Sequence, residues 1–141
     1  PSDILAAFLC GQLEHRDAIQ AKRKAVWDAY AHGLADWAGQ QGVQTPTIPP
    51  GCQQAYHMFY MLLPSLKLRT AFISALKESG VGAVFHYGHL HRSQMATPQP
   101  SPCPVTEDVS DRLVRLPLFA DLTETEVARV IDVVRQQDFR T

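Results

Sequence analysis

Residues 56–63 read Tyr-His-Met-Phe-Tyr-Met-Leu-Leu, an apolar run that separates a helical region from the mixed pattern after it. It is too short for a buried helix, it is rich in aromatic residues, and apolar groups fall on both of its faces. We therefore predict a central β-strand that is covered on both sides, with His57 inside the core. Pro64 ends the strand, since proline lacks the N–H that a sheet ladder needs.

The segments after this strand predict one helix, one strand and a long loop. A helix is expected from about Lys67 to Ser79, ended by Gly80, because glycine readily adopts the left-handed conformation of a helix stop. Residues 81–87 predict a second strand. Residues 88–104 contain four prolines and predict a surface loop long enough to serve a function or a partner. The inner face of the helix is expected to comprise Leu68, Phe72, Ile73 and Leu76.

Two further helices are predicted toward the end of the chain. Thr106 is the expected cap of the first, and residues 116–118 then read as extended chain. Thr123 and Glu126 have the spacing of a capping box, which predicts the start of a helix that ends near Gln137. The expected inner face of the first helix is Val109, Leu113 and Leu116, and that of the second is Val127, Val130, Ile131 and Val134.

Residues 3–39 carry apolar side chains at helical spacing and predict a long helical arm. The register slips between Glu14 and Ala18, so we expect two helices or one kinked helix. Ser2 or Asp3 can cap the start, and Gly39 and Gly42 are the expected end. The whole pattern predicts an α+β fold in one domain, 1–141, with a helical arm over 1–40 and a layer of helices on a small sheet over 41–141.

Composition excludes several classes of protein. The 13 basic and 14 acidic residues nearly balance, which argues against a broad surface for nucleic acid or anionic membrane. The three cysteines are an odd, scattered set, typical of free thiols in a reducing compartment. No apolar run is long enough for a transmembrane helix. We therefore expect a cytoplasmic protein that binds neither nucleic acid nor membrane.

Three histidines lie within residues 86–91, at positions 86, 89 and 91. They could form a ligand-contacting turn, or they could join His57 in a zinc or nickel site. Their spacing matches neither the helical pair of metalloproteases nor a zinc ribbon, and no carboxylate occurs in the chain between Glu78 and Glu107. The ligand-contacting turn is therefore the favoured interpretation.

Five pieces of the chain, in this order and spacing, resemble the C-terminal part of the DegT-type nucleotide-sugar aminotransferases, which use pyridoxal 5′-phosphate (PLP). The resemblance implies the small C-terminal domain of a fold-type I PLP-dependent transferase. The matching pieces are Ile4-Leu5-Ala6-Ala7 with Gln12-Leu13, His57-Met58-Phe59-Tyr60, His86-Tyr87 with Leu90-His91, Leu116-Pro117-Leu118-Phe119, and Leu122-Thr123-Glu124.

Within that family, the runs over 55–60 and 84–87 are most similar to the dTDP-4-oxo-6-deoxyglucose aminotransferases, although Tyr56 is one residue more than the subgroup has. The resemblance implies transfer of an amino group from glutamate to a keto-deoxy nucleotide sugar, for surface polysaccharide such as lipopolysaccharide. It also implies a homodimer.

The resemblance places residues 86–91, which we call the histidine turn, at the mouth of the substrate site. It implies that His86, Tyr87 and His91 contact the nucleotide sugar. A neutral imidazole, with one donor and one acceptor, suits sugar hydroxyls, whereas a cationic imidazole favours a diphosphate. This chain departs from the family at Gly88-His89, where a proline is usual, so the turn is less constrained here.

The family's PLP-binding large domain, with the lysine that attaches the cofactor, is absent from this sequence. The chain opens directly in an apolar helical pattern, as expected for part of a longer protein. Its four lysines (Lys22, Lys24, Lys67 and Lys77) read as solvated helix residues. We therefore expect this chain alone to hold no PLP and to be inactive.

Two other functions remain open from the residues alone. The chain could be a stand-alone binding or oligomerisation module, because the long arm carries a broad apolar stripe that includes Phe8, Trp27, Tyr30 and Trp37. It could also be a small metalloenzyme built on the histidines.

Overall fold

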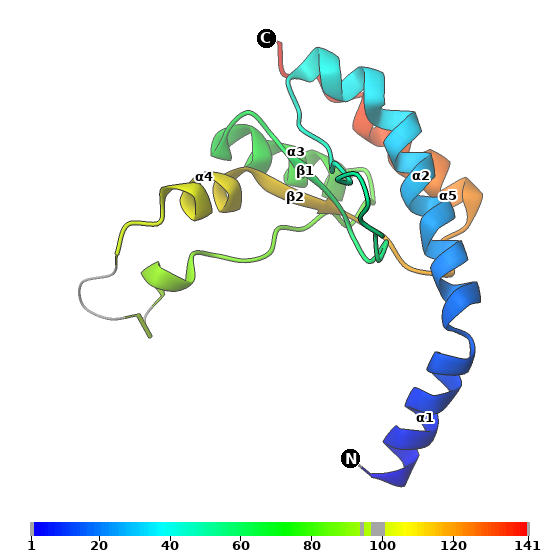
Figure 1. Cartoon of the computed structure of the whole chain (residues 1–141). Helices are drawn as coiled ribbons and strands as arrows, with labels where there is room; N and C mark the ends of the chain where they lie inside the picture. Colours follow the sequence, from blue (N-terminus) through cyan, green and yellow to red (C-terminus); the bar gives the residue numbers. More distant parts are fainter. Residues whose placement is uncertain (1, 94, 97–100, 141) are drawn as a thin grey trace.

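The computed structural model describes residues 2–93, 95–96 and 101–140. Its elements follow the order helix, helix, strand, helix, short 3-10 helix, helix, strand, helix. This is the predicted α+β class, with helices packed on a small sheet (Figure 1). The part of the expected proline-rich loop that contains Pro98 and Pro100 lies outside the described residues.

The sheet has two antiparallel strands, β1 (Phe59–Leu62) and β2 (Leu113–Leu116). Isolated bridges widen it on each side: Gln44 pairs with Leu62, and Val84 pairs with Arg115. The strand predicted over 81–87 is thus reduced to its contact at Val84, whose N–H and C=O both bond Arg115, at 3.1 and 2.7 Å.

Only one face of this sheet is buried. Phe59 and Met61 are fully buried, together with Val114 and Leu116 opposite them. The alternate residues of both strands are half-buried: Tyr60, Leu62, Leu113 and Arg115. The prediction of a strand covered on both sides was therefore wrong. The apolar run instead supplies one core face and one open face, since successive side chains of a strand point to opposite sides.

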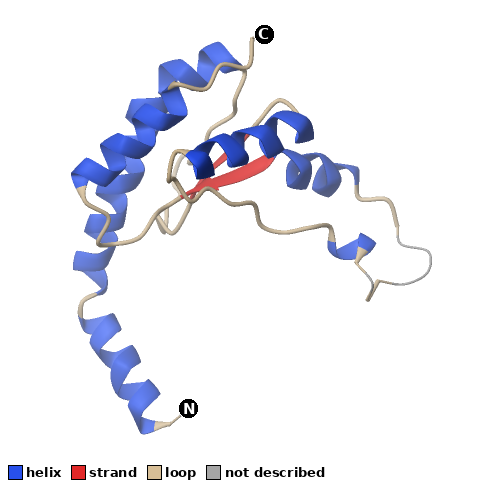
Figure 2. Ribbon diagram, turned by 180° about the vertical axis from the view of Figure 1, so that it is seen from behind, coloured by secondary structure: helices blue, strands red, loops and turns tan. Residues whose placement is uncertain are grey.

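The core lies between the buried sheet face and three helices. In α2 (Arg16–Gln41), Trp27 and Tyr30 contact the ring of Phe59 at centroid distances of 5.6 and 5.5 Å. α3 (Leu66–Glu78) begins at its cap Ser65 and contributes Phe72 and Leu76. Gly80 adopts the predicted left-handed conformation after it. Figure 2 shows α3 lying across the strands.

α5 (Glu124–Arg135) packs beside α2, as Figure 1 shows. Its capping box between Thr123 and Glu126 is present as predicted. The contact buries Val127, Val130 and Val134, and also Val133, whereas Ile131 is half-buried. Two side chains of α2 bond the chain that flanks α5: the Tyr30 hydroxyl donates to the Pro117 carbonyl and Trp37 Nε1 donates to the Gln137 carbonyl, both at 2.8 Å.

α1 (Asp3–Glu14) meets α2 at His15, inside the predicted break, and Ser2 caps it as expected. Gly42, in the left-handed region, ends α2, while Gly39 remains helical. No residue of α1 is buried, and the helix projects away from the rest of the protein (Figures 1 and 2). Its exposed apolar side chains are Ile4, Leu5, Phe8, Leu9 and Leu13.

α4 (Pro104–Arg112) differs from the prediction at both ends. It starts at Pro104, because proline is favoured in the first helical turn, and not at Thr106. It stops at Arg112, so Leu113 and Leu116 belong to β2 and not to the helix. Alternating burial over these residues is the signature of a strand that pairs with β1. No helix of the described residues is long and apolar enough to cross a membrane.

Candidate functional site

His86 and Tyr87 lie in the segment that leaves Val84, on the edge of β2. Both side chains are exposed, and their rings meet edge to face with centroids 4.8 Å apart. Arg115 Nη1 donates to Nδ1 of His86 at 3.2 Å. The Tyr87 carbonyl accepts a hydrogen bond from the Ser110 hydroxyl of α4. The Ser110 bond holds the backbone at Tyr87, while the Tyr87 ring stays exposed beside His86.

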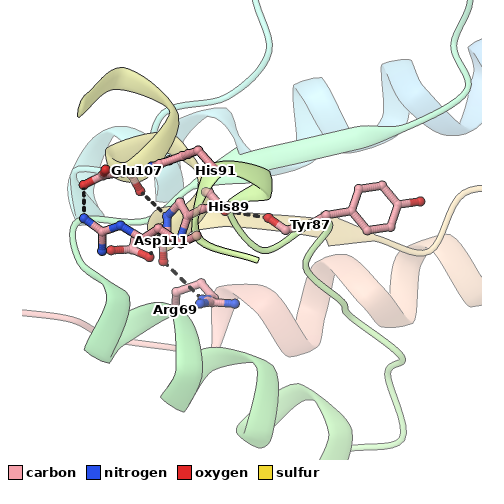
Figure 3. A network of polar contacts seen from close by, with 8 residues as sticks. Arg69, Tyr87, His89, His91, Glu107 and Asp111 are labelled. Atoms are coloured by element: carbon pink, nitrogen blue, oxygen red, sulfur yellow. Dashed lines mark hydrogen bonds and ion pairs between the residues drawn. The ribbon is translucent and has the colours of Figure 1, made fainter. Parts of the chain in front are cut away.

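His89 and His91 are held by carboxyl groups of α4 (Figure 3). His91 Nε2 lies 2.8 Å from Glu107 Oε1, and Arg92 donates to the other oxygen of Glu107 at 2.5 Å. His89 Nε2 donates to the Glu107 carbonyl at 3.3 Å and lies 3.5 Å from Asp111. The gap in carboxylates between Glu78 and Glu107 in the sequence therefore does not leave the histidines without acidic neighbours, because α4 brings Glu107 and Asp111 back to the turn.

The Glu107 carboxylate is the centre of this network. The hydrogen bond from His91 lowers the pKa of Glu107 below its ordinary value, and the Arg92 guanidinium lowers it further. Glu107 is therefore ionised at neutral pH and ties η1 (Leu90–Arg92) to α4. Arg69 of α3 anchors the other end of α4, since its Nε donates to the Asp111 carbonyl at 3.2 Å.

The three predicted site residues line one groove. A cavity of about 630 Å³ is bordered by His86, Tyr87 and His91. Its other walls are largely apolar and include Leu90, Val105, Val109 and Leu113. Such a groove can hold a small ligand whose apolar part faces α4 and whose polar groups meet the imidazoles. The histidine turn and α4 thus form one surface, although 12 or more residues separate them in sequence.

The histidines do not form a metal cluster in the described part of the chain, where no group of three or more His, Cys, Asp or Glu side chains is placed to hold an ion. His89 and His91 each face one carboxyl group instead. His57 lies apart from them and is exposed. The prediction that it belongs to the core was wrong, because β1 begins only at Phe59.

Four polar residues of the site escaped the sequence-based prediction: Arg69, Glu107, Asp111 and Arg115. One signal was available, since Glu107 and Asp111 are four residues apart and therefore share one face of a helix. Arg69 gave no such signal. It is buried, and its guanidinium lies 4.1 Å from the centre of the Phe85 ring.

The lysines of this chain do not fit a PLP site. All four are exposed on α2 or α3. Lys22 pairs with Asp121 at 2.9 Å and Lys24 pairs with Asp28. A lysine that attaches PLP must instead sit beside a phosphate cradle and a partner for the pyridine nitrogen.

The chain is similar to several solved structures, among them aminotransferases. It aligns with DesV from S. venezuelae at 29% identity and a TM-score of 0.82, covering 96% of this chain and 36% of DesV. The aminotransferase TlmJ from Streptoalloteichus hindustanus aligns at 24% identity and a TM-score of 0.81, covering 89% of this chain and 33% of TlmJ. The putative sugar aminotransferase Spr1654 from Streptococcus pneumoniae, solved in a PMP form, aligns at 21% identity and a TM-score of 0.81. The alignment covers 95% of this chain and 34% of Spr1654.

The chain thus spans about a third of the length of these structures. It has the α+β fold of a fragment of a fold-type I PLP-dependent aminotransferase. A family model also matches residues 2–135, nearly the whole chain. This chain belongs to the DegT/DnrJ/EryC1/StrS aminotransferase family, whose members depend on PLP.

Proposed function

We propose that this chain is the small-domain part of a PLP-dependent aminotransferase that acts on a keto-deoxy nucleotide sugar. The single observation that carries the proposal is the family match over residues 2–135, on a chain that spans a third of its solved relatives. The resemblance of 55–60 and 84–87 to the dTDP-4-oxo-6-deoxyglucose aminotransferases supports a 6-deoxy sugar, glutamate as the amino donor, and a role in surface polysaccharide synthesis.

We propose that His86 and Tyr87 contact the nucleotide sugar directly. Both are exposed at the rim of the groove, and their rings contact each other edge to face. His91 lines the same groove, but its Nε2 faces Glu107, so only the rest of its ring is available to substrate. The apolar wall of α4 suits the deoxy part of the sugar ring.

We also propose that the cofactor is held by parts of the protein outside these 141 residues, in a large domain that precedes them. When bound, PLP supplies the electron sink for amino transfer. The residues of this chain would form one wall of the substrate site, in a cytoplasmic homodimer. The proposal rests on the exposure of all four lysines, on the ion pairs of Lys22 and Lys24, and on the share of the relatives that the chain covers.

A trapping experiment tests the cofactor part of this proposal. The 141-residue chain is incubated with PLP, reduced with borohydride, and digested for mass spectrometry. Random, substoichiometric labelling of several exposed lysines is the expected result. Stoichiometric labelling of one lysine would show that the chain builds its own cofactor site, and the proposal of a separate PLP-binding part would be abandoned.

A second candidate function is a stand-alone oligomerisation module. One observation favours it: the five large apolar side chains of α1 are exposed, from 57 to 81% of their surface. Light scattering coupled to size exclusion tests this second candidate on the 141-residue chain. A tight oligomer that dissociates when Phe8 and Leu9 are both changed to glutamate supports the module, whereas an unchanged elution position argues against it.

A further inference from the structure

Arg115 and His86 are neighbours because of the sheet register. Val84 and Arg115 form the isolated antiparallel bridge, and His86 follows Val84 by two residues. In such a pair, a residue and its diagonal partner two positions on lie on the same face, within reach of a long side chain. Both backbone bonds of the bridge are made, so the origin of the Arg115 side chain is fixed beside His86.

In the contact between the two side chains, Arg115 is the donor and His86 is the acceptor. Arg115 Nη1 lies 3.2 Å from His86 Nδ1. A guanidinium can only donate, and it stays protonated at all physiological pH values. His86 Nδ1 must therefore accept, which means that it carries no proton. The imidazole then holds its proton on Nε2, at the opposite side of the ring from Arg115.

We infer that Arg115 is a positioning residue, which occupies Nδ1 of His86 and presents Nε2–H to the ligand. His86 is thereby a hydrogen-bond donor with a set orientation. Of the ligand groups that an imidazole could meet, it selects an oxygen that accepts, such as a keto or phosphate oxygen. A hydroxyl can still bind, but only through its oxygen lone pairs. This inference rests on the proposed function only for the identity of the ligand.

Arg115 also places its positive charge on the open face of the sheet, next to His86. It is half-buried, and no carboxylate pairs with it in the described residues. The guanidinium thus donates to Nδ1 of His86, and the imidazole in turn offers its Nε2–H to a ligand. An uncharged, apolar residue at position 115 would leave the His86 ring free to rotate and to exchange tautomers.

Nitrogen NMR of the ¹⁵N-histidine-labelled chain tests the inference without any ligand. Long-range ¹H–¹⁵N spectra are recorded at about pH 8, above the ordinary imidazole pKa of about 6.5. The His86 signals are assigned by their loss in His86→Gln. We expect an unprotonated Nδ1 and a protonated Nε2. In Arg115→Met, the Nδ1 signal moves and a second tautomer gains population, whereas Arg115→Lys, which keeps a donor, restores most of the wild-type pattern.

Arg129→Met is the matched control, because Arg129 lies on α5 and bonds the Ser79 carbonyl, away from His86. It should leave the His86 signals unchanged. A protonated Nδ1 of His86 in the wild type would overturn the inference. An Nδ1 signal that Arg115→Met leaves in place would also overturn it. Neither result bears on amino transfer, and a failure of amino transfer would leave the pairing intact.

Discussion

Single residues hold together parts of this chain that are distant in sequence. Glu107 ties the histidine turn to α4, and the Tyr30 hydroxyl ties α2 to the segment after β2. Each contact joins an element to a loop, so each is a place where a side-chain change should be felt locally. Burial also raises the pKa of Tyr30 well above its ordinary value, so this hydroxyl remains a donor over the physiological range.

Changing Glu107 to glutamine should free η1 from α4. The pKa of Glu107 is lower in the folded chain than its ordinary value of 4.5, so its ionised form stabilises the fold above that value. The stabilisation is lost as the pH falls through the folded pKa. The melting temperature of Glu107→Gln should therefore lie below that of the wild type at pH 7, and the two should converge in acid.

Glu78→Gln is the control for the loss of one carboxylate, because Glu78 is exposed at the end of α3. Melting curves followed by circular dichroism between neutral and acid pH measure both variants. A Glu107→Gln deficit that persists undiminished in acid would contradict the role given to the ionised carboxylate.

Changing Tyr30 to phenylalanine should leave the Pro117 carbonyl without its donor. Tyr30 is fully buried and its bond to Pro117 is 2.8 Å long. Loss of the bond should lower the free energy of unfolding by about 1–2 kcal/mol, measured by urea denaturation. Tyr60→Phe, at a half-buried position with no hydrogen bond from its hydroxyl in the described residues, should change it by less than about 0.5 kcal/mol.

A contact could be predicted from the sequence when the two residues that make it lie close together along the chain. The caps at Ser2 and Thr123 and the glycine stop at Gly80 were predicted, because each depends on residues at most three or four apart. The partner of His91 was missed. Glu107 is 16 residues further on, and only the placement of α4 brings it within 2.8 Å.

At the level of elements, α2 and α5 approach each other closely at Gly33. A Cβ at Gly33 would lie 2.8 Å from Cδ1 of Ile131 and 3.2 Å from its Cγ2, so the two helices approach closely there. Gly39 is in the same helix, and a Cβ there would meet nothing within 4 Å. A substitution at Gly39 therefore reports helix propensity alone, whereas one at Gly33 reports helix propensity together with packing against Ile131.

Alanine at these two positions should have opposite effects. Gly39→Ala should stabilise the protein by about 0.5–1 kcal/mol, because glycine is a poor helix former. Gly33→Ala gains the same propensity but overpacks Ile131, at a cost of about 1–3 kcal/mol, and should destabilise overall. Urea denaturation measures both. Equal stabilisation by the two substitutions would contradict this prediction, because the Ile131 side chain would then have moved aside without cost.

Elements with local signals were predicted well, whereas those that depend on pairing were not. The break between α1 and α2 and the span of α3 follow from helical periodicity and capping. β2 was taken for the end of a helix, because Val109, Leu113 and Leu116 also fit a helical stripe. Its strand conformation depends on pairing with β1, some 50 residues earlier in the chain.

At the level of the whole molecule, the protein has a packed body and an arm. The core lies between α2, α3, α5 and the sheet, and α1 contributes no buried residue to it. The division between arm and body therefore falls at His15, earlier than the boundary near residue 40 expected from sequence, because α2 is part of the core.

Removing residues 1–14 should leave the body folded. The free energy of unfolding in urea should change by less than about 0.5 kcal/mol, since no buried contact is lost. Leu76→Ala, at a fully buried position in α3, is the positive control and should cost about 2–5 kcal/mol. A loss of stability in urea as large as that of Leu76→Ala would show that α1 is part of the core.

The most direct test of this account is amino transfer by the complete protein encoded by the reading frame that contains these residues. Glutamate and dTDP-4-oxo-6-deoxyglucose are supplied with PLP, and the amino sugar is detected by mass spectrometry. We predict that the amino sugar forms, that His86→Gln lowers kcat/KM at least about tenfold, equivalent to about 1.4 kcal/mol, and that His32→Gln on the exposed side of α2 leaves it unchanged. The account would be contradicted if no amino sugar formed when the keto sugar was supplied. It would also be contradicted if His86→Gln and the wild type had equal kcat/KM.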